Sequence, residues 1–294
     1  EACQPARAGG RAEAAVRTPA SALSLLRPRR LREALRMLRD EGPLVPLAGG
    51  TDLYVGLNAG TVADRRFLDL WPLDELRGIE VRGHRLRIGA LTTYTDLIAS
   101  RVVATRVPML AAAARDVGGR QIQHRGTIGG NVANASPAGD TLPVLAASDA
   151  EVVLASASHE RTVPLTRFFT GYRATVRQPG EIIAGIEIPV ILGRQWWCKV
   201  GTRRAQAISK VSLAGTYLPG GGHGAPLVRL AFGSIAPTVI RVPATEAALG
   251  EGASLEEAQA VLAGEIHPID DLRSTADYRR AVCLNLIRAF LQAV

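Results

Sequence analysis

Cysteines and long apolar runs are scarce in this sequence of 294 residues, and each scarcity excludes a class of protein. The three cysteines, Cys3, Cys198 and Cys283, form no CxxC or CxxH spacing, so we expect neither a zinc site nor an iron–sulfur cluster held by this chain alone. No run of about 18 apolar residues is present to span a membrane. The first residues lack the pattern of a charged, then apolar, then small-residue segment, so we expect no signal sequence. We therefore expect a cytoplasmic protein with reduced thiols and no metal site of its own.

Aromatic residues are also scarce, at 4% of the chain, which leaves few side chains to stack on nucleic-acid bases. Lysine and arginine outnumber aspartate and glutamate by 35 to 27, and much of this excess lies in the arginine-rich residues 1–39. No recognisable nucleic-acid motif accompanies the positive charge. The excess of basic residues therefore indicates a solvated, arginine-rich surface, and nucleic acid is not an expected partner.

The alternation of apolar and polar residues predicts an α+β chain with an irregular tail or linker at residues 1–20. In the first folded part we expect helices at 31–42, 52–59, 93–100 and 107–117, strands at 44–48, 66–70 and 181–189, and a hairpin at 81–90. In the last third we expect strands at 211–218 and 227–236 and helices at 254–264 and 275–294. Ser254 with Glu257 has the spacing of a capping box, and Thr275 is the expected cap of the last helix.

Two glycine-rich stretches stand out as candidate binding segments. We call LAGGTDLY (residues 47–54) the first glycine segment and GTIGGNVANASPAGD (residues 126–140) the second. Because glycine has no Cβ and tolerates positive φ, such segments can bring backbone N–H groups against a phosphate. Neither segment contains lysine or arginine, and the chain has no GxGxxG motif opening a βαβ unit and no GxxxxGK[ST] motif. This composition favours an anion held by backbone amides.

The two segments, together with GYRATVRQPGEIIAGIEIP (171–189) and KVGTRRAQAISKVSLAG (199–215), resemble the FAD-binding (medium) subunit of molybdenum hydroxylases. That family includes xanthine dehydrogenase and carbon monoxide dehydrogenase. The resemblance implies a two-lobed FAD-binding domain of the PCMH type over residues 21–193. It also implies a smaller α+β C-terminal domain, in which strands pack against helices, over residues 194–294.

The resemblance assigns FAD contacts to sixteen positions and a catalytic role to none. The positions are Leu47, Ala48, Gly49, Gly50, Thr51, Asp52, Leu53, Tyr54, Thr127, Ile128, Gly129, Gly130, Asn131, Asp140, Ile183 and Lys199. Asp140 is suited to accept from ribityl or ribose hydroxyls, and Lys199 to place positive charge near the flavin. Three plainer interpretations stay open, namely a helix cap for Asp140, core packing for Ile183 and a surface lysine for Lys199.

The implied function is that of an electron-transfer subunit carrying non-covalent FAD. A large partner would hold the molybdenum cofactor and a small partner two [2Fe–2S] clusters, with electrons passing through FAD to NAD⁺ or another acceptor. The resemblance favours a xanthine dehydrogenase-like complex arranged as a dimer of heterotrimers. A free-standing FAD oxidase or reductase and a flavin-free scaffold remain alternatives.

The adjacent Trp196 and Trp197 are expected to shield a flavin edge or a partner surface, and Arg203 with Arg204 to line a subunit interface.

Overall fold

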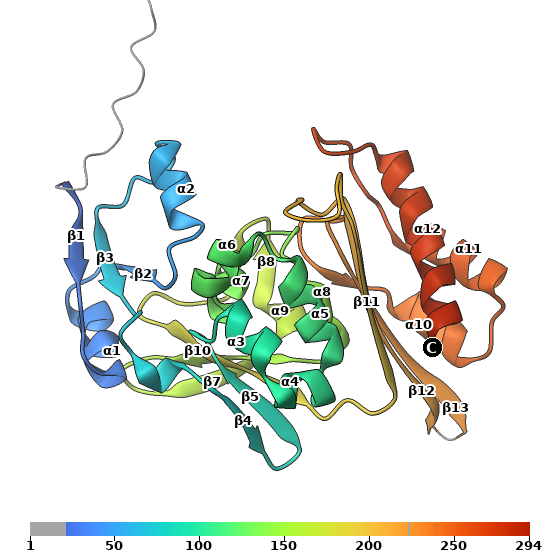
Figure 1. The fold of residues 1–294 in the computed structure, drawn as a ribbon, viewed down its shortest axis with the longest axis horizontal. Coiled ribbons are helices and arrows are strands. Elements are labelled where there is room, and N and C mark those ends of the chain that lie inside the picture. The colour runs from blue at the N-terminus through green and yellow to red at the C-terminus, as the bar shows by residue number, and fades with distance from the viewer. Residues whose placement is uncertain (1–21, 223) are drawn as a thin grey trace, which may run out of the picture.

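The computed structural model describes residues 22–222 and 224–294, and the predicted tail at residues 1–20 lies outside them. Three hydrophobic cores divide these residues into an N-terminal lobe, a central sheet covered by helices, and a C-terminal sheet with its own helices (Figure 1). Helices and strands are mixed in all three, which confirms the predicted α+β fold. No helix within these ranges is both long and apolar enough to cross a membrane.

The N-terminal lobe is a three-stranded parallel sheet in the order β1-β3-β2. Its elements are β1 (Ser24–Leu26), α1 (Leu31–Asp40), β2 (Val45–Leu47), α2 (Leu53–Asn58), β3 (Arg66–Asp69) and a 3₁₀ turn at Asp74–Leu76. Helix α1 buries Ala34, Leu35 and Leu38, which lie on one face of the helix at spacings of one and three to four residues. The first glycine segment therefore leaves a parallel strand at Leu47 and enters a helix at Leu53, as expected.

The central sheet is antiparallel, in the order β4-β5-β10-β6-β7. Its strands are β4 (Ile79–Arg82), β5 (Arg85–Gly89), β6 (Glu151–Ala155), β7 (Glu160–Pro164) and β10 (Ile182–Pro189). Alternate residues of β6 enter different cores: Val152 and Leu154 pack under the helices, whereas Val153 and Ala155 pack against the N-terminal lobe. Because both faces are covered at this end, the strand is a continuous apolar run with no polar alternation.

One face of the central sheet is covered by short helices (Figure 1). They are α3 (Tyr94–Ala99), α4 (Arg101–Arg106), α5 (Pro108–Asp116), α6 (Arg120–Arg125), α7 (Ile128–Asn134), α8 (Thr141–Ala147) and α9 (Leu165–Phe168). A small hairpin, β8 (Phe169–Gly171) with β9 (Ala174–Thr175), follows α9. Helix α7 makes up about half of the second glycine segment. The side chain of Thr127 caps this helix by accepting the N–H of Gly130 at 3.0 Å.

The C-terminal sheet has the order β11-β12-β13-β14. Its elements are β11 (Arg194–Val200), β12 (Val211–Gly222), β13 (Ala225–Gly233), β14 (Ile240–Arg241), α10 (Pro243–Gly250), α11 (Leu255–Glu265) and α12 (Ala276–Ala293). The predicted capping box of Ser254 and the cap of Thr275 are confirmed, whereas β11, β14 and α10 are additions to the prediction. The sheet is buried on both faces, with Leu213 facing α10–α12 and its neighbour Ala214 facing the central helices.

The two adjacent tryptophans of β11 point to opposite faces of this sheet. Trp196 packs edge-on against Phe290 of α12, with ring centroids 6.1 Å apart. The indole N–H of Trp197 donates to the carboxylate of Asp116 at the end of α5, at 2.8 Å. Both indole rings therefore make contacts within this chain.

Phe290 tests the core of the C-terminal sheet, because its ring is fully buried and faces Trp196. We expect Phe290→Ala to lower the free energy of unfolding by about 3–5 kcal/mol, since a cavity replaces a buried ring. Leu272→Ala is the matched control, because Leu272 is 100% exposed and its loss should change stability by less than about 0.5 kcal/mol. Urea unfolding of the purified variants measures both, and equal midpoints would contradict the assignment of this core.

Candidate functional site

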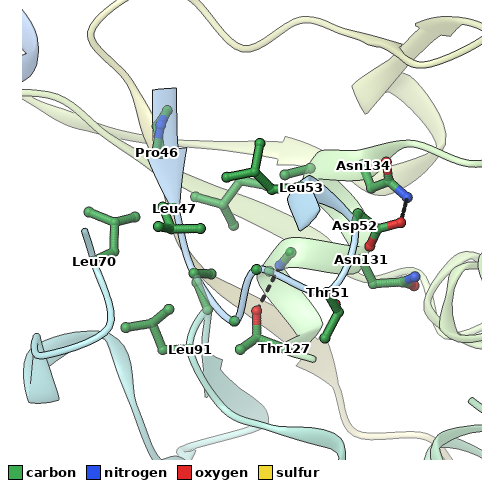
Figure 2. A pocket seen from close by; sticks show the side chains of 18 of the residues that line it. Pro46, Leu47, Thr51, Asp52, Leu53, Leu70, Leu91, Thr127, Asn131 and Asn134 are labelled. Carbon is green, nitrogen blue, oxygen red and sulfur yellow. Dashed lines mark hydrogen bonds between the residues drawn. The ribbon is translucent and has the colours of Figure 1, made fainter. Parts of the chain in front are cut away.

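A cavity of about 330 Å³ opens between the N-terminal lobe and the helices of the central sheet. Both glycine segments contribute to its wall, as Figure 2 shows. Twelve of the sixteen predicted positions line it: Leu47, Ala48, Gly49, Gly50, Thr51, Asp52, Leu53, Thr127, Gly129, Gly130, Asn131 and Ile183. The structure therefore brings together two stretches of sequence that lie some 80 residues apart.

The first glycine segment follows its path because two positions require glycine. At Gly49 a Cβ atom would lie 1.7 Å from the carbonyl oxygen of Arg125, the last residue of α6, so only a glycine backbone fits there. Gly50 has φ +79°, in the left-handed region that favours glycine. These two residues turn the chain from β2 into α2 while holding it against α6.

The amide groups of the first segment are free. The N–H groups of Gly49, Gly50, Thr51 and Asp52 donate to no acceptor within the described residues. Asp52 is at the N-cap of α2 but its side chain makes no capping hydrogen bond. Unpaired donors at a turn before a helix form a cradle for an anion such as a phosphate.

The second glycine segment is arranged differently, because its amides are paired within the chain. The N–H of Ile128 donates to the carbonyl of Thr92 at 3.0 Å, and that of Gly129 to Ala90 at 2.9 Å. A Cβ at Gly129 would lie 2.6 Å from that of Ala90, which explains the glycine. The second segment thus forms a wall of the cavity, while the first offers the free donors.

Four predicted positions lie outside the cavity lining. Ile128, the first residue of α7, is fully buried, and Tyr54 of α2 is 64% exposed. Asp140 and Lys199 form a buried ion pair with Nζ 2.6 Å from Oδ2, at the junction between α8 and β11. For these four positions, contact with FAD stays a prediction.

The Asp140–Lys199 pair joins the central helices to the C-terminal sheet. Lys199 also donates to the carbonyl of Asp116 at 2.9 Å, and the hydroxyl of Ser209 donates to the other carboxylate oxygen of Asp140 at 2.7 Å. Burial raises the pKa of Asp140, and the charge and hydrogen bond of Lys199 oppose that rise. Asp140 therefore acts as a bridge between domains here, and its side chain makes no hydrogen bond that caps α8.

Sequence reasoning missed several side chains of the wall, chiefly Tyr94, Asn134 and Arg177. Tyr94 is buried at the start of α3, and its hydroxyl makes no hydrogen bond within the described residues. Burial raises its pKa, and the charges of Asp52 and Asp140 raise it further, so the phenol is neutral. The capping box of Thr93 with Asp96 marks the start of this helix in the sequence, but nothing there shows that the ring of Tyr94 borders a cavity.

The lining also has an apolar side, formed by leucines that include Leu70, Leu76 and Leu91. In Figure 2, Leu70 and Leu91 lie on one side of the first segment, and Asp52, Asn131 and Asn134 lie on the other. An apolar wall beside polar groups and free amides suits a ligand with a flat ring and a phosphate. No group of three His, Cys, Asp or Glu side chains in residues 22–222 and 224–294 is placed to hold a metal ion.

Comparison with known families divides the chain into two matches. Residues 21–191 match the FAD-binding domain in molybdopterin dehydrogenase, and residues 196–294 match the CO dehydrogenase flavoprotein C-terminal domain. The chain is 33% identical to the glyceraldehyde dehydrogenase medium chain of Sulfolobus acidocaldarius, covering 88% of this chain and 93% of the relative. It is 31% identical to the xanthine dehydrogenase FAD-binding subunit of Escherichia coli O157:H7, covering 90% and 91%.

Solved structures agree with these matches over nearly the whole chain. A chain of the carbon monoxide dehydrogenase from Hydrogenophaga pseudoflava, in a form that lacks the Mo-pyranopterin moiety, superposes with a TM-score of 0.86 at 31% identity. The match covers 92% of this chain and 96% of the other. A chain of quinoline 2-oxidoreductase from Pseudomonas putida 86 gives a TM-score of 0.85 at 25% identity, with the same coverage.

Gly49 provides a direct test of the cavity. We expect Gly49→Ala to weaken FAD binding at least tenfold, because the added Cβ must push the first segment away from the carbonyl of Arg125. Gly264→Ala in α11 is the matched control, since a Cβ there meets no atom within 4 Å. Fluorescence titration with FAD measures the affinities, and equal affinity of both variants would contradict the role of the first segment.

Substitution of Lys199 tests the contribution of its ion pair with Asp140 to stability. We expect Lys199→Met to lower the free energy of unfolding by about 3–5 kcal/mol at neutral pH, because it leaves the charge of Asp140 buried without its partner. Burial raises the pKa of Asp140 in the folded state, so the folded variant takes up a proton more readily than the unfolded chain and the loss shrinks as the pH falls. Urea unfolding at two pH values measures this, with the Asp140→Asn/Lys199→Met double variant as the neutral control; a pH-independent loss would disagree.

Proposed function

The chain belongs to the flavoprotein subunits of the molybdenum hydroxylases, and from this premise we propose that it relays electrons through an FAD held in the cavity between the two glycine segments. The electrons come from [2Fe–2S] clusters of a small partner subunit, and a large partner carries the molybdenum cofactor and binds the substrate. They leave to NAD⁺ or another acceptor. The relatives, which are medium chains and FAD-binding subunits of dehydrogenases, support this division of tasks.

The observation that carries this proposal is the row of free amides in the first glycine segment. The diphosphate of FAD is an anion that needs several hydrogen-bond donors, and Gly49, Gly50, Thr51 and Asp52 offer four beside the cavity. The apolar wall that includes Leu70 and Leu91 suits a flat aromatic ring. The residues of the site therefore fit FAD, although none of them is a lysine or arginine within either glycine segment.

The chemistry of the relay belongs to the cofactor. Bound flavin supplies the ability to exchange electrons both singly and in pairs, which links one-electron clusters to a two-electron acceptor. The residues of this chain bind the cofactor, orient it and keep water from part of its surface. No acid, base or nucleophile from this chain is required.

The finer parts of the proposal concern substrate, acceptor and assembly. A xanthine dehydrogenase-like complex that reduces NAD⁺ is our working proposal, supported by the likeness of KVGTRRAQAISKV (199–211) to such subunits. Relatives named for glyceraldehyde, carbon monoxide and xanthine dehydrogenases lie between 30% and 33% identity, so overall identity singles out none of them. A dimer of heterotrimers in the cytoplasm completes the proposal. The free thiols of Cys198 and Cys283 agree with that compartment.

Removal and return of the flavin test the proposal in the intact complex. The chain is purified with its partner subunits, stripped of FAD with a chaotropic salt, and assayed with xanthine. We expect the stripped complex to reduce a dye that accepts electrons from the iron–sulfur clusters, but to lose NAD⁺ reduction until FAD is added back. Unchanged NAD⁺ reduction in the stripped complex would falsify the relay. Mass measurement by light scattering tests the assembly in the same preparation.

A further inference from the structure

Two consecutive side-chain hydrogen bonds link both glycine segments to the β8–β9 hairpin. The guanidinium Nη1 of Arg173 donates to Oδ1 of Asn134 at 2.6 Å, and Nδ2 of Asn134 donates to Oδ1 of Asp52 at 2.9 Å. Figure 2 shows the second of these hydrogen bonds at the edge of the cavity. Asp52 ends the free-amide turn of the first segment, and Asn134 is the last residue of α7 in the second.

The amide of Asn134 is oriented by its two neighbours. A carboxylate can only accept and a guanidinium can only donate, so the side-chain oxygen must face Arg173 and the side-chain nitrogen must face Asp52. If either charged group is removed, that orientation is no longer determined. The geometry of the contact between the two segments thus depends on Arg173, which belongs to neither.

Arg173 is held in an uncommon conformation. It lies at the turn of the β8–β9 hairpin with φ +52°, in the left-handed region that is unfavourable for residues other than glycine. The base of the hairpin is firmly anchored, because Arg161 donates to the carbonyl of Val176 at 3.1 Å and forms a two-bond ion pair with the buried Glu181. The hairpin that follows from this anchored base places the guanidinium of Arg173 within hydrogen-bond distance of Asn134.

Charge adds a second reason for an arginine at this position. The two glycine segments contain no cationic side chain, and Asp52 brings a negative charge next to amides that are suited to an anion. A carboxylate beside a diphosphate is unfavourable unless a cation offsets it. Arg173 offsets the charge of Asp52 and is linked to it by the amide of Asn134. Arg177 also lines the cavity, but its guanidinium donates to the carbonyl of Glu181 at 2.8 Å.

We propose that Arg173 is a positioning residue of the FAD site, which acts through Asn134 to hold Asp52 and the adjacent free amides against α7. The proposal rests on the proposed function, because the ligand that benefits is FAD. Loss of Arg173 leaves the cavity lining intact but frees the Asp52 turn to move. FAD must then order this turn on binding, and its affinity falls.

The first experiment measures FAD affinity in the complex after flavin removal, by fluorescence titration. We expect Arg173→Met to raise the Kd about 10- to 100-fold, the range for loss of a hydrogen bond to a charged group, and Arg173→Lys to recover most of that loss. Arg167→Ala is the matched control, because this exposed arginine on α9 forms no hydrogen bond or ion pair with the described residues. We expect its Kd to equal that of the wild type.

A double-variant cycle shows whether Arg173 acts through Asn134. If it does, Arg173→Met combined with Asn134→Ala binds FAD no worse than Asn134→Ala alone. Fully additive losses would mean that Arg173 acts independently of Asn134 and would overturn the proposal. A wild-type complex that binds no FAD overturns the proposed function itself, whereas normal binding by the wild type and by Arg173→Met overturns only this inference.

The pH dependence of binding is a readout that a purely structural arginine would not change. Asp52 is exposed at the rim of the cavity, but partial desolvation by the neighbouring wall raises its pKa, and the charge of Arg173 and the hydrogen bond from Asn134 lower it; the nearby Tyr94 is neutral. Arg173 both orients Asn134 toward ionised Asp52 and offsets the charge of that carboxylate, so its contribution to FAD affinity requires Asp52 to be ionised. The affinity deficit of Arg173→Met relative to the wild type should therefore shrink as the pH falls through the pKa of Asp52, whereas Arg173→Lys should follow the wild type. A deficit that does not change with pH would contradict the proposal.

Discussion

The cavity depends on one close contact between two stretches of backbone, that of Gly49 with the carbonyl of Arg125. A Cβ atom at Gly49 would lie 1.7 Å from that oxygen, so the contact exists only because the residue is glycine. It holds the N-terminal lobe against the helices of the central sheet at the point where the first glycine segment turns. The free amides of Gly50, Thr51 and Asp52 are placed by this turn, and with them the side of the cavity that suits a diphosphate.

The two glycine segments have different tasks although their compositions are alike. The first leaves its donors free, whereas the second uses its donors to pack α7 against Ala90 and Thr92. The C-terminal sheet then braces the second segment from behind, since Ser234 donates its N–H to Pro137 at 2.8 Å and Lys199 pairs with Asp140. A subunit that binds its flavin in one domain thus relies on the other domain to support one wall of the site.

Much of the fold could be predicted from local patterns. The hairpin around Gly83, the capping box of Ser254 and the strand–turn–helix of the first segment all depend on neighbouring residues, and all are confirmed. The helix α7 was missed because glycine and asparagine have low helix propensity. Its stability comes from the cap of Thr127 and from packing against Ala90, a contact with a residue far away in the sequence.

The sequence by itself determined the α+β class, the two glycine segments and the resemblance to a flavoprotein family, because short motifs and periodicity carry that information. Only the tertiary structure decided which amides remain free, that Asp140 pairs with Lys199, and that Tyr94, Asn134 and Arg177 border the cavity. Each of these depends on contacts between residues tens of positions apart. Such pairings follow from how strands and helices pack, and a single sequence read by spacing does not contain them.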